Sequence, residues 1–376
     1  MWKTAFNFMI YDKAKFIGIL SGIVISIFII GAQLGMLNGI YDTALVFLKD
    51  NTEYIYVVSP KSTSSGSLVN IDKRIGNELL SIDGVEKAYP LIFTMGNVKY
   101  RSGNSATAAI IGVQAPDYAG APKEYLSGTD LNELHNEGAV IIDAGDIENM
   151  ENIKLGEYFT LNENRVYVSG FSIKNPGLGQ QNIVTTVERA RKLSNFPINQ
   201  VSAFLVKTKS NDLLLQEIIA TTIEASIPNI KARTGLAFNQ ESIDYMATSS
   251  GIMFGFMIMV AFALITGLII VGLTMFTSVK DRMKDYGTIK AIGGSNSMIT
   301  KMILIQSIIY SFFGYVIAMI ILFGLKFLMA LVNQALNFSP SVIVFLLTAT
   351  LIIGIVSSYF SLRKILKLDP VEIFRM

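Results

Sequence analysis

Four long apolar runs restrict what this sequence can fold into. They cover residues 16–40, 251–279, 302–332 and 342–362, and strongly polar side chains are rare within them. About 20 consecutive apolar residues are enough for a helix to cross the hydrocarbon layer of a bilayer. Buried helices of soluble proteins are seldom so long and so uncharged. We therefore expect four transmembrane helices, and the sequence argues against a wholly soluble enzyme.

The first run invites comparison with a cleaved signal peptide. A secretory signal has a core of about 7–15 apolar residues, followed by a cleavage site with small residues. The run over 16–40 is longer, and its segment Gly31-Ala32-Gln33-Leu34-Gly35 is a poor cleavage site. We therefore favour a helix that stays in the membrane.

The distribution of charge predicts how the helices are oriented. Residues 41–250 hold 18 Lys and Arg against 24 Asp and Glu, whereas the rest of the chain holds 13 basic against 5 acidic residues. Loops rich in Lys and Arg stay in the cytoplasm. We therefore expect both termini and the 280–301 loop inside, and the acidic 41–250 segment outside. The basic residues are too dispersed for a nucleic-acid site.

The external segment 41–250 is long enough for a domain with its own core. Strand-forming residues gather at 54–58, 106–113, 139–142, 158–161, 165–171 and 203–207, and helical candidates cover 71–81, 187–193 and 212–226. In the last of these, Leu214, Ile218, Ile219 and Ile223 recur at helical spacing. The alternation suggests βαβ-type units. The predicted fold class is an α+β membrane protein, with four transmembrane helices and a large mixed α/β extracytoplasmic domain between helices one and two.

The residues offer no catalytic constellation. The chain has no cysteine, and its single histidine, His135, lies near Glu133 and Glu137. We interpret this group as a surface polar cluster rather than a metal site, because no second histidine accompanies it. No phosphate-binding glycine loop is found, and Ser62–Ser67 is expected to be a solvated connector rather than a lid. We therefore predict no catalytic residue, no metal and no cofactor of its own.

The most informative stretch follows the second apolar run, at 279–295. Its sequence is VKDRMKDYGTIKAIGGS, in which Met283, Tyr286, Ile289 and Ile292 recur at three-residue steps. This spacing predicts a short helix with one apolar face, and Ser295 can cap the helix that comes next. Such a helix either lies on lipid or inserts into a groove of a cytoplasmic partner.

At these residues the sequence resembles the FtsX/MacB-type permeases of ABC transporters. The resemblance extends to the C-terminal segment LDPVEIFR at 368–375, to GVEKAYP at 84–90 and to the stretch over 153–170. The chain length and the residues Met1-Trp2-Lys3-Thr4-Ala5 look most like the DevC group and the related haem-exporter permeases.

The resemblance implies a stand-alone permease of the MacB-like (type VII) class in the bacterial cytoplasmic membrane. Only residues 1–15 precede the first helix, so its ATPase is expected to be a separate subunit that binds the ATP. The expected assembly is two permeases with two ATPases, joined in some cases by a periplasmic adaptor and an outer-membrane channel. Closure of the ATPases would move the external domains, which push or release a substrate. The alternatives are an FtsX-like regulator of cell-wall hydrolases and a lipoprotein-release permease.

Two sets of residues are assigned roles on this basis. The contact with the ATPase is predicted at Met283, Tyr286, Gly287, Ile289 and Gly293. Small residues spaced four apart allow close helix contact, either at a dimer seam or within one chain, and they occur at Gly18, Gly22, Gly31, Gly35, Gly251 and Gly255.

The two ends of the membrane segment carry further expectations. Residues 1–15 predict a short amphipathic helix on the inner membrane face, and residues 363–376 a cytoplasmic tail. The second run would extend about 43 Å as a helix, longer than a hydrocarbon layer of about 30 Å. We therefore favour a stalk that continues into the external domain over a tilted helix.

Overall fold

The computed structural model describes residues 9, 12–174, 180–249, 251–331 and 334–366. The chain divides into two compact units. The membrane unit comprises residues 1–39 and 252–376, and the sheet unit comprises residues 40–251. Each unit is described by itself. Residues 1–8, which hold most of the expected N-terminal helix, and the tail residues 367–376 lie outside the described part of the chain.

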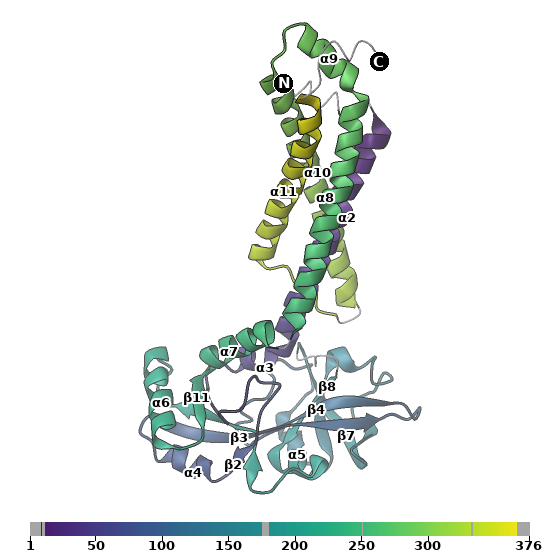
Figure 1. Cartoon of the computed structure of the whole chain (residues 1–376). Coiled ribbons are helices and arrows are strands. Elements are labelled where there is room, and N and C mark those ends of the chain that lie inside the picture. Colours follow the sequence, from purple (N-terminus) through teal and green to yellow (C-terminus); the bar gives the residue numbers. More distant parts are fainter. Residues whose placement is uncertain (1–8, 10–11, 175–179, 250, 332–333, 367–376) are drawn as a thin grey trace. The chain divides into compact units, whose positions relative to one another are not determined.

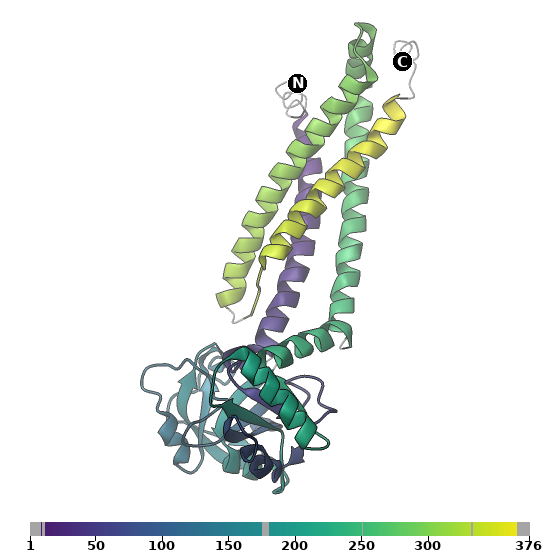
Figure 2. The same ribbon diagram turned by 90° about the vertical axis from the view of Figure 1, so that its left-hand side faces the viewer.

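The membrane unit contains four helices long and apolar enough to span a bilayer. They are α2 (Lys13–Ala44), α8 (Ile252–Asp281), α10 (Asn296–Leu331) and α11 (Pro340–Leu366). Figure 2 shows them running along one another as a bundle. The four predicted runs are confirmed as helices. Each helix begins or ends a few residues beyond its run, because polar residues at the ends of a span can also be helical.

The core of the bundle is an aliphatic stripe. On α2, Ile19, Ile23, Ile27 and Ile30 are buried against α8, α10 and α11. The opposite side of the same helix is also apolar, and Ile17 and Ile25 are 62% and 54% exposed. A helix that is hydrophobic all round suits a membrane span, in which lipid covers the outer side.

The sheet unit is built on nine strands in the order β11-β1-β10-β3-β4-β8-β5-β7-β6. The strands are β1 (Ile55–Val58), β3 (Val85–Lys99), β4 (Ser105–Val113), β5 (Ala139–Asp143), β6 (Tyr158–Leu161), β7 (Asn164–Ser172), β8 (Gln181–Thr186), β10 (Ala203–Thr208) and β11 (Lys231–Thr234). A two-stranded ladder pairs β2 (Ile71–Asp72) with β9 (Gln200–Val201).

The expectation of βαβ-type units is confirmed in a split form. β1 and β3 run in the same direction on either side of β10 and are joined through α4 (Ile75–Leu80), and β10 and β11 run in the same direction on either side of β1 and are joined through α6 (Leu213–Ser226). Only the β4–β8 and β5–β7 pairs of the large sheet are parallel. The chain between the partners of each pair runs through other strands and through the short 3-10 turns η1 (Leu131–His135) and η2 (Ala144–Asp146). The sheet is therefore mostly antiparallel, although it is mixed α/β as predicted.

The longest strand was not predicted from the sequence. β3 pairs with β10 over its first half and with β4 over its second half. Pro90 lies inside it, opposite Phe204, and a proline within an apolar run normally argues against an inner strand. The position is tolerated because β3 changes partner just beyond it.

Helices cover both faces of the sheet, as Figure 1 shows. α3 (Val46–Asp50) and α7 (Gly235–Thr248) lie over one face, while α4 (Ile75–Leu80), α5 (Val187–Ser194) and α6 (Leu213–Ser226) cover the other. Along β1, Tyr56 and Val58 are buried in the core beneath α3 and α7, whereas Ile55 and Val57 are buried in the core beneath α4 and α6. A strand buried on both faces explains the continuous apolar run at 54–58.

Helix α6 is present as predicted, but only half of its periodic apolar residues mark its buried side: Ile223 is buried and Ile219 packs against the core, whereas the other two are exposed. Leu214 and Ile218 are 71% and 60% exposed, whereas Gln216 and Ala220 are buried. The Gln216 amide donates to the Glu53 carbonyl at 3.1 Å, so its burial is compensated by a hydrogen bond. The Leu214–Ile218 stripe therefore lies on the surface of the unit.

One local expectation is corrected. The serine-rich segment 62–67 is not a solvated connector, because Ser62, Ser64 and Ser65 are buried. Its turn is closed by Ser67 N–H donating to the Ser64 carbonyl at 3.0 Å, and Ser62 Oγ accepts from Val69 N–H at 2.9 Å. The second membrane helix, α8, has about the length of the predicted run, and the stalk at its outer end stays a prediction.

Candidate functional site

The 279–295 motif folds into α9 (Met283–Ala291), which lies at one end of the bundle between α8 and α10 (Figure 1). Its two glycines end the helix. Gly293 has φ +96° and donates to the Lys290 carbonyl at 3.1 Å, and Gly294 donates to the Ile289 carbonyl at 2.8 Å. This pair of bonds is a Schellman motif, which needs a residue in the left-handed conformation.

The turn after α9 is held tightly. A Cβ at residue 294 would lie 2.6 Å from both the Ile289 carbonyl oxygen and its side chain, so only glycine fits there. Ser295 Oγ accepts from Met298 N–H at 3.2 Å, which confirms the predicted cap of the next helix. The motif Gly293-Gly294-Ser295 therefore ends one helix and starts another within three residues.

The inner side of α9 is anchored in the bundle. Tyr286 is only 2% exposed, and it belongs to the same buried cluster as Met9, Ile299 and Ile303. Its hydroxyl is hydrogen-bonded to the Gln306 side chain on α10, and burial raises the pKa of Tyr286 to about 12. Gly287 is buried beside it. These two predicted contact residues thus face the chain's own helices, because the tyrosine ring fills the bundle core.

The outer side of α9 and its turn is open. Ile292 is 80% exposed and Gly293 is also exposed, whereas Met283 and Ile289 are half-buried. The three-residue spacing predicted that these apolar residues share one face. In the structure some of them point toward the bundle and others point outward. Of the apolar residues in the motif, Ile292 has the most accessible side chain, although it was not among the predicted contact residues.

An ion-pair chain lies at the same end of the bundle. The Lys15 ammonium is 2.9 Å from the Asp12 carboxylate and 2.5 Å from that of Asp281. It therefore links the beginning of α2 to the end of α8, next to α9. All three side chains are partly exposed, so each pair contributes modestly to stability.

The predicted packing glycines fall into two groups. A Cβ on Gly18 or Gly22 would touch α8, on Gly31 it would reach Leu322 and Leu346, and on Gly35 it would lie 2.6 Å from Phe338. These four glycines of α2 therefore pack within the chain. Gly251 and Gly255 have nothing within 4 Å of a Cβ, so they leave a small-residue surface on α8.

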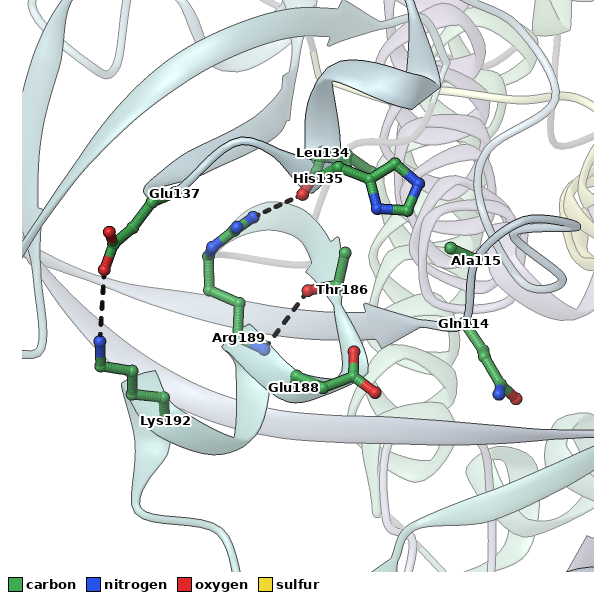
Figure 3. Close-up of a pocket in the computed structure, with 9 residues that line it drawn as sticks. All are labelled: Gln114, Ala115, Leu134, His135, Glu137, Thr186, Glu188, Arg189 and Lys192. Atoms are coloured by element: carbon green, nitrogen blue, oxygen red, sulfur yellow. Dashed lines mark hydrogen bonds and ion pairs between the residues drawn. The ribbon is translucent and has the colours of Figure 1, made fainter.

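His135 lies on the wall of an open cavity of about 420 Å³ in the sheet unit (Figure 3). The neighbouring Arg189 is committed to structure: its guanidinium donates to the carbonyls of Leu134, Asn136 and Ala139 at 2.6–2.9 Å. Lys192 pairs with Glu137 at 3.5 Å. Among the described residues there is no cluster of three His, Cys, Asp or Glu that could hold a metal ion.

Two buried aspartates were not predicted from the sequence. Asp143 and Asp146 are 2% and 6% exposed at the end of β5. Asp143 caps η2 by accepting from Gly145 N–H at 2.9 Å and from the Ser172 hydroxyl at 3.1 Å. Burial, with the nearby charge of Asp143, raises the pKa of Asp146 to about 6. In the sequence this pair is marked only by its position, because both aspartates come within four residues of the end of the apolar run 139–142.

Two family models match the chain. The MacB-like periplasmic core domain matches residues 16–220, and the FtsX-like permease C-terminal domain matches residues 257–370. The first covers more than half of the chain. Both describe parts of permeases, and neither describes an ATPase domain.

Curated relatives agree with these matches. The chain is 24% identical over 324 residues to a macrolide export ATP-binding/permease protein MacB 2 of Aeromonas hydrophila, covering 82% of this chain and 49% of the relative. It is 29% identical over 126 residues to an uncharacterized ABC transporter permease of Methanocaldococcus jannaschii, covering 31% of each. The chain thus spans half or less of the length of these relatives.

Solved structures similar to this one are extracytoplasmic domains. The periplasmic region of MacB from Actinobacillus actinomycetemcomitans has 12% identity and a TM-score of 0.40, covering 52% of this chain and 94% of that one. The extracellular domain of the noncanonic ABC-type transporter YknZ from Gram-positive bacteria has 16% identity and a TM-score of 0.36, covering 48% and 99%.

Proposed function

Because this chain belongs to the FtsX/MacB-type permeases of ABC transporters, we propose that it couples ATP hydrolysis by a separate cytoplasmic ATPase to movement of its periplasmic domain. The observation that carries this proposal is the two-sided construction of α9. Its inner side is fixed to α10 by Tyr286 and Gln306, while Ile292 projects from its outer end.

The geometry suits a mechanical input. A partner that binds the exposed Ile292 would push on a short helix whose ends are both fixed, by the link to α8 and by the Gly293-Gly294-Ser295 turn into α10. The buried Tyr286 ring prevents α9 from sliding over the bundle. A displacement of α9 would therefore move α8 and α10 rather than be lost in a flexible loop.

The same proposal covers the wider assembly. The charge distribution supports a cytoplasmic position for both termini and α9, and the family resemblance favours two permeases with two ATPases. The likeness to a macrolide export protein favours export or extrusion of a substrate over regulation of hydrolases or lipoprotein release. The subgroup assignment to DevC or haem-exporter permeases rests on Met1–Ala5 and on chain length.

The test is a charge on the outer side of α9. Ile292→Glu places a carboxylate where the side chain is 80% exposed, so the fold should be retained. We expect the variant to insert and melt like the wild type, yet to lose co-purification with the ATPase and stimulation of ATP hydrolysis in nanodiscs. Gln334→Glu is the matched control, because it adds the same charge at an exposed position beyond the other end of α10.

Tyr286→Phe probes the inner side separately. It keeps the ring and removes the hydroxyl that bonds to Gln306. We expect ATPase binding to persist while the stimulated rate falls, because contact and transmission involve different sides of α9. Normal coupling in both variants would refute the role given to α9.

A further inference from the structure

A second cavity, of about 180 Å³, lies in the periplasmic sheet unit where α2 meets α3. Ala44, the last residue of α2, and Val46 and Phe47 of α3 form one wall. Phe93 of β3 and Ile111 of β4 form the floor. The turn at Ser65 and Gly66 lies on the rim. The walls therefore come from parts of the unit that are far apart in sequence.

The lining is apolar with an uncharged polar edge. None of the described lining residues has an ionisable side chain, and the polar ones are hydroxyls and amides, such as Ser65 and Asn182. A charged group placed here would lose its hydration without gaining a counter-ion. The cavity is therefore suited to an apolar group with a neutral polar neighbour.

The rim is a built structure, which explains the unexpected burial of the serine segment. Ser62, Ser64 and Ser65 are all buried, and the turn over 64–67 is closed by a backbone hydrogen bond of 3.0 Å. Ser62 Oγ fixes the following chain by accepting from Val69 N–H at 2.9 Å. The polar side chains thus hold Gly66 at the mouth of an apolar space.

The size of the cavity limits what enters it. A volume of 180 Å³ is smaller than the roughly 300 Å³ at which pockets for drug-sized ligands begin. It therefore has room for the end of a chain rather than for a whole ligand. Its wall includes Ala44, the last residue of α2, and this helix is long and apolar enough to span a membrane, in which chains of amphiphiles are present.

We propose that this cavity binds the end of an aliphatic chain of a neutral amphiphile, with the polar neck of the molecule at the Ser65 rim. The ligand has two sources, a membrane lipid or a free amphiphile in transit, and both present the same chemistry. The inference goes beyond coupling to the ATPase and does not depend on it.

The probe is a long-chain fatty alcohol with a photoreactive diazirine near its chain end, added to the full-length protein in nanodiscs. We expect saturable labelling of the peptides that hold Phe47 and Phe93, competed by unlabelled alcohol. A second arm uses nanodiscs whose lipids carry the diazirine in their acyl chains. Labelling in that arm identifies membrane lipid as a source, and labelling by added alcohol alone identifies a free amphiphile; either result supports a chain site.

Gly66→Leu is the decisive variant. A Cβ at this position meets nothing within 4 Å and its φ lies outside the left-handed region, so a leucine can be placed at the mouth of the cavity without backbone strain. We expect labelling of these peptides to fall by about ten-fold or more, because the added side chain occupies the space of the ligand. Ser67→Leu is the control, since Ser67 is exposed and does not line the cavity.

Three results would overturn the proposal: labelling confined to the four membrane helices, labelling that does not saturate, or labelling that Gly66→Leu leaves unchanged. Melting curves of both variants establish that they are folded. Val46→Phe fills the cavity from the opposite wall, and it provides the same test if Gly66→Leu does not fold.

Discussion

The membrane unit and the sheet unit bury their polar groups in different ways. In the membrane unit the buried polar side chains are mostly hydroxyls, and several of them bond to carbonyls one turn back, such as Ser26 to Gly22 at 2.8 Å and Thr350 to Leu346 at 2.6 Å. The sheet unit instead buries ionisable groups, among them Asp143 and Asp146. A hydroxyl that bonds within its own helix needs no partner from outside, which suits a span surrounded by lipid.

Glycines let elements approach closely in both units. In the membrane unit a Cβ on Gly354 would lie 2.2 Å from Ser311 Oγ, and in the sheet unit a Cβ on Gly170 would lie 2.3 Å from the Thr129 side chain. Added volume at such a glycine should therefore be costly in either unit, whereas the comparison of buried polar groups predicts that the sheet unit is the more sensitive to lost hydrogen bonds.

The largest loss of stability is expected at Gly39, the last residue of α2 that belongs to the membrane unit. A Cβ there would lie 1.9 Å from the Ala335 carbonyl oxygen, and backbone cannot move away as a flexible side chain can. We expect Gly39→Val to cost about 4 kcal/mol or more, enough to prevent folding. The measurement is thermal unfolding of the purified protein in detergent.

Gly255→Val is the matched control for that prediction. Nothing lies within 4 Å of a Cβ at this position, so the stability of a single chain should hardly change. If permease–permease cross-linking falls while stability holds, α8 forms the dimer seam that the glycine spacing suggested. A stable Gly39→Val protein would show that volume is tolerated in the bundle and that close approach at a glycine is not costly there.

A smaller loss is expected in the sheet unit at Arg189. Arg189→Met keeps much of the side-chain length but removes the hydrogen bonds to the carbonyls of Leu134, Asn136 and Ala139. Ala139 keeps a hydrogen bond from the Thr185 hydroxyl, but the loss of the other bonds should cost about 2–3 kcal/mol. Amide hydrogen exchange of β5 peptides in the intact protein reports the change.

Lys192→Met tests whether the hydrogen bonds, and not simply a positive charge, account for that loss. Lys192 lies on the same helix, α5, and its ion pair with Glu137 is 3.5 Å long and exposed on both sides. Exposed pairs contribute little. Equal effects of the two substitutions would contradict the assignment.

The sequence predicts the membrane unit better than the sheet unit, for a physical reason. In lipid, length and lack of charge suffice to identify a span, and all four were found. In the sheet unit, tertiary pairing overrides local pattern: β3 passes through Pro90, and α6 buries Gln216 while exposing Leu214. These positions depend on partners distant in sequence, which periodicity does not reveal.

The candidate site shows the same limit. Ser295 of the motif was predicted correctly as a cap, because that role depends on backbone conformation. The prediction of which side chains of the motif face a partner was wrong for Tyr286, which is buried in the bundle. Tyr286 and Ile292 are six residues apart and appear on one face by spacing, but the turn at Gly293 ends the helix at Ile292 and leaves that side chain outward.

The last and smallest effect depends on pH and is confined to the sheet unit. The folded protein holds the pKa of Asp146 at about 6, above its ordinary value of 3.8, because the ionised carboxylate is buried. Between these values the folded state binds more protons than the unfolded state, so the free energy of unfolding falls as pH rises. Above about pH 6 the full penalty applies, of the order of 1–3 kcal/mol.

Asp146→Asn removes the charge and keeps the shape. We expect the variant to be more stable than the wild type at pH 8 and about equal to it at pH 4, as measured by hydrogen exchange of β5 and β8 peptides at the two pH values.

Asp117→Asn should behave in the opposite way, because hydrogen bonds from Lys87 and Tyr89 lower the pKa of Asp117. Its stabilising contribution is present above the ordinary pKa and is lost as pH falls, so removing it costs stability at pH 8. The prediction fails if the stability gain of Asp146→Asn over the wild type is no larger at pH 8 than at pH 4. The buried carboxylate would then be compensated by its surroundings. The contrast between a membrane unit without buried charge and a sheet unit strained by it would then not hold.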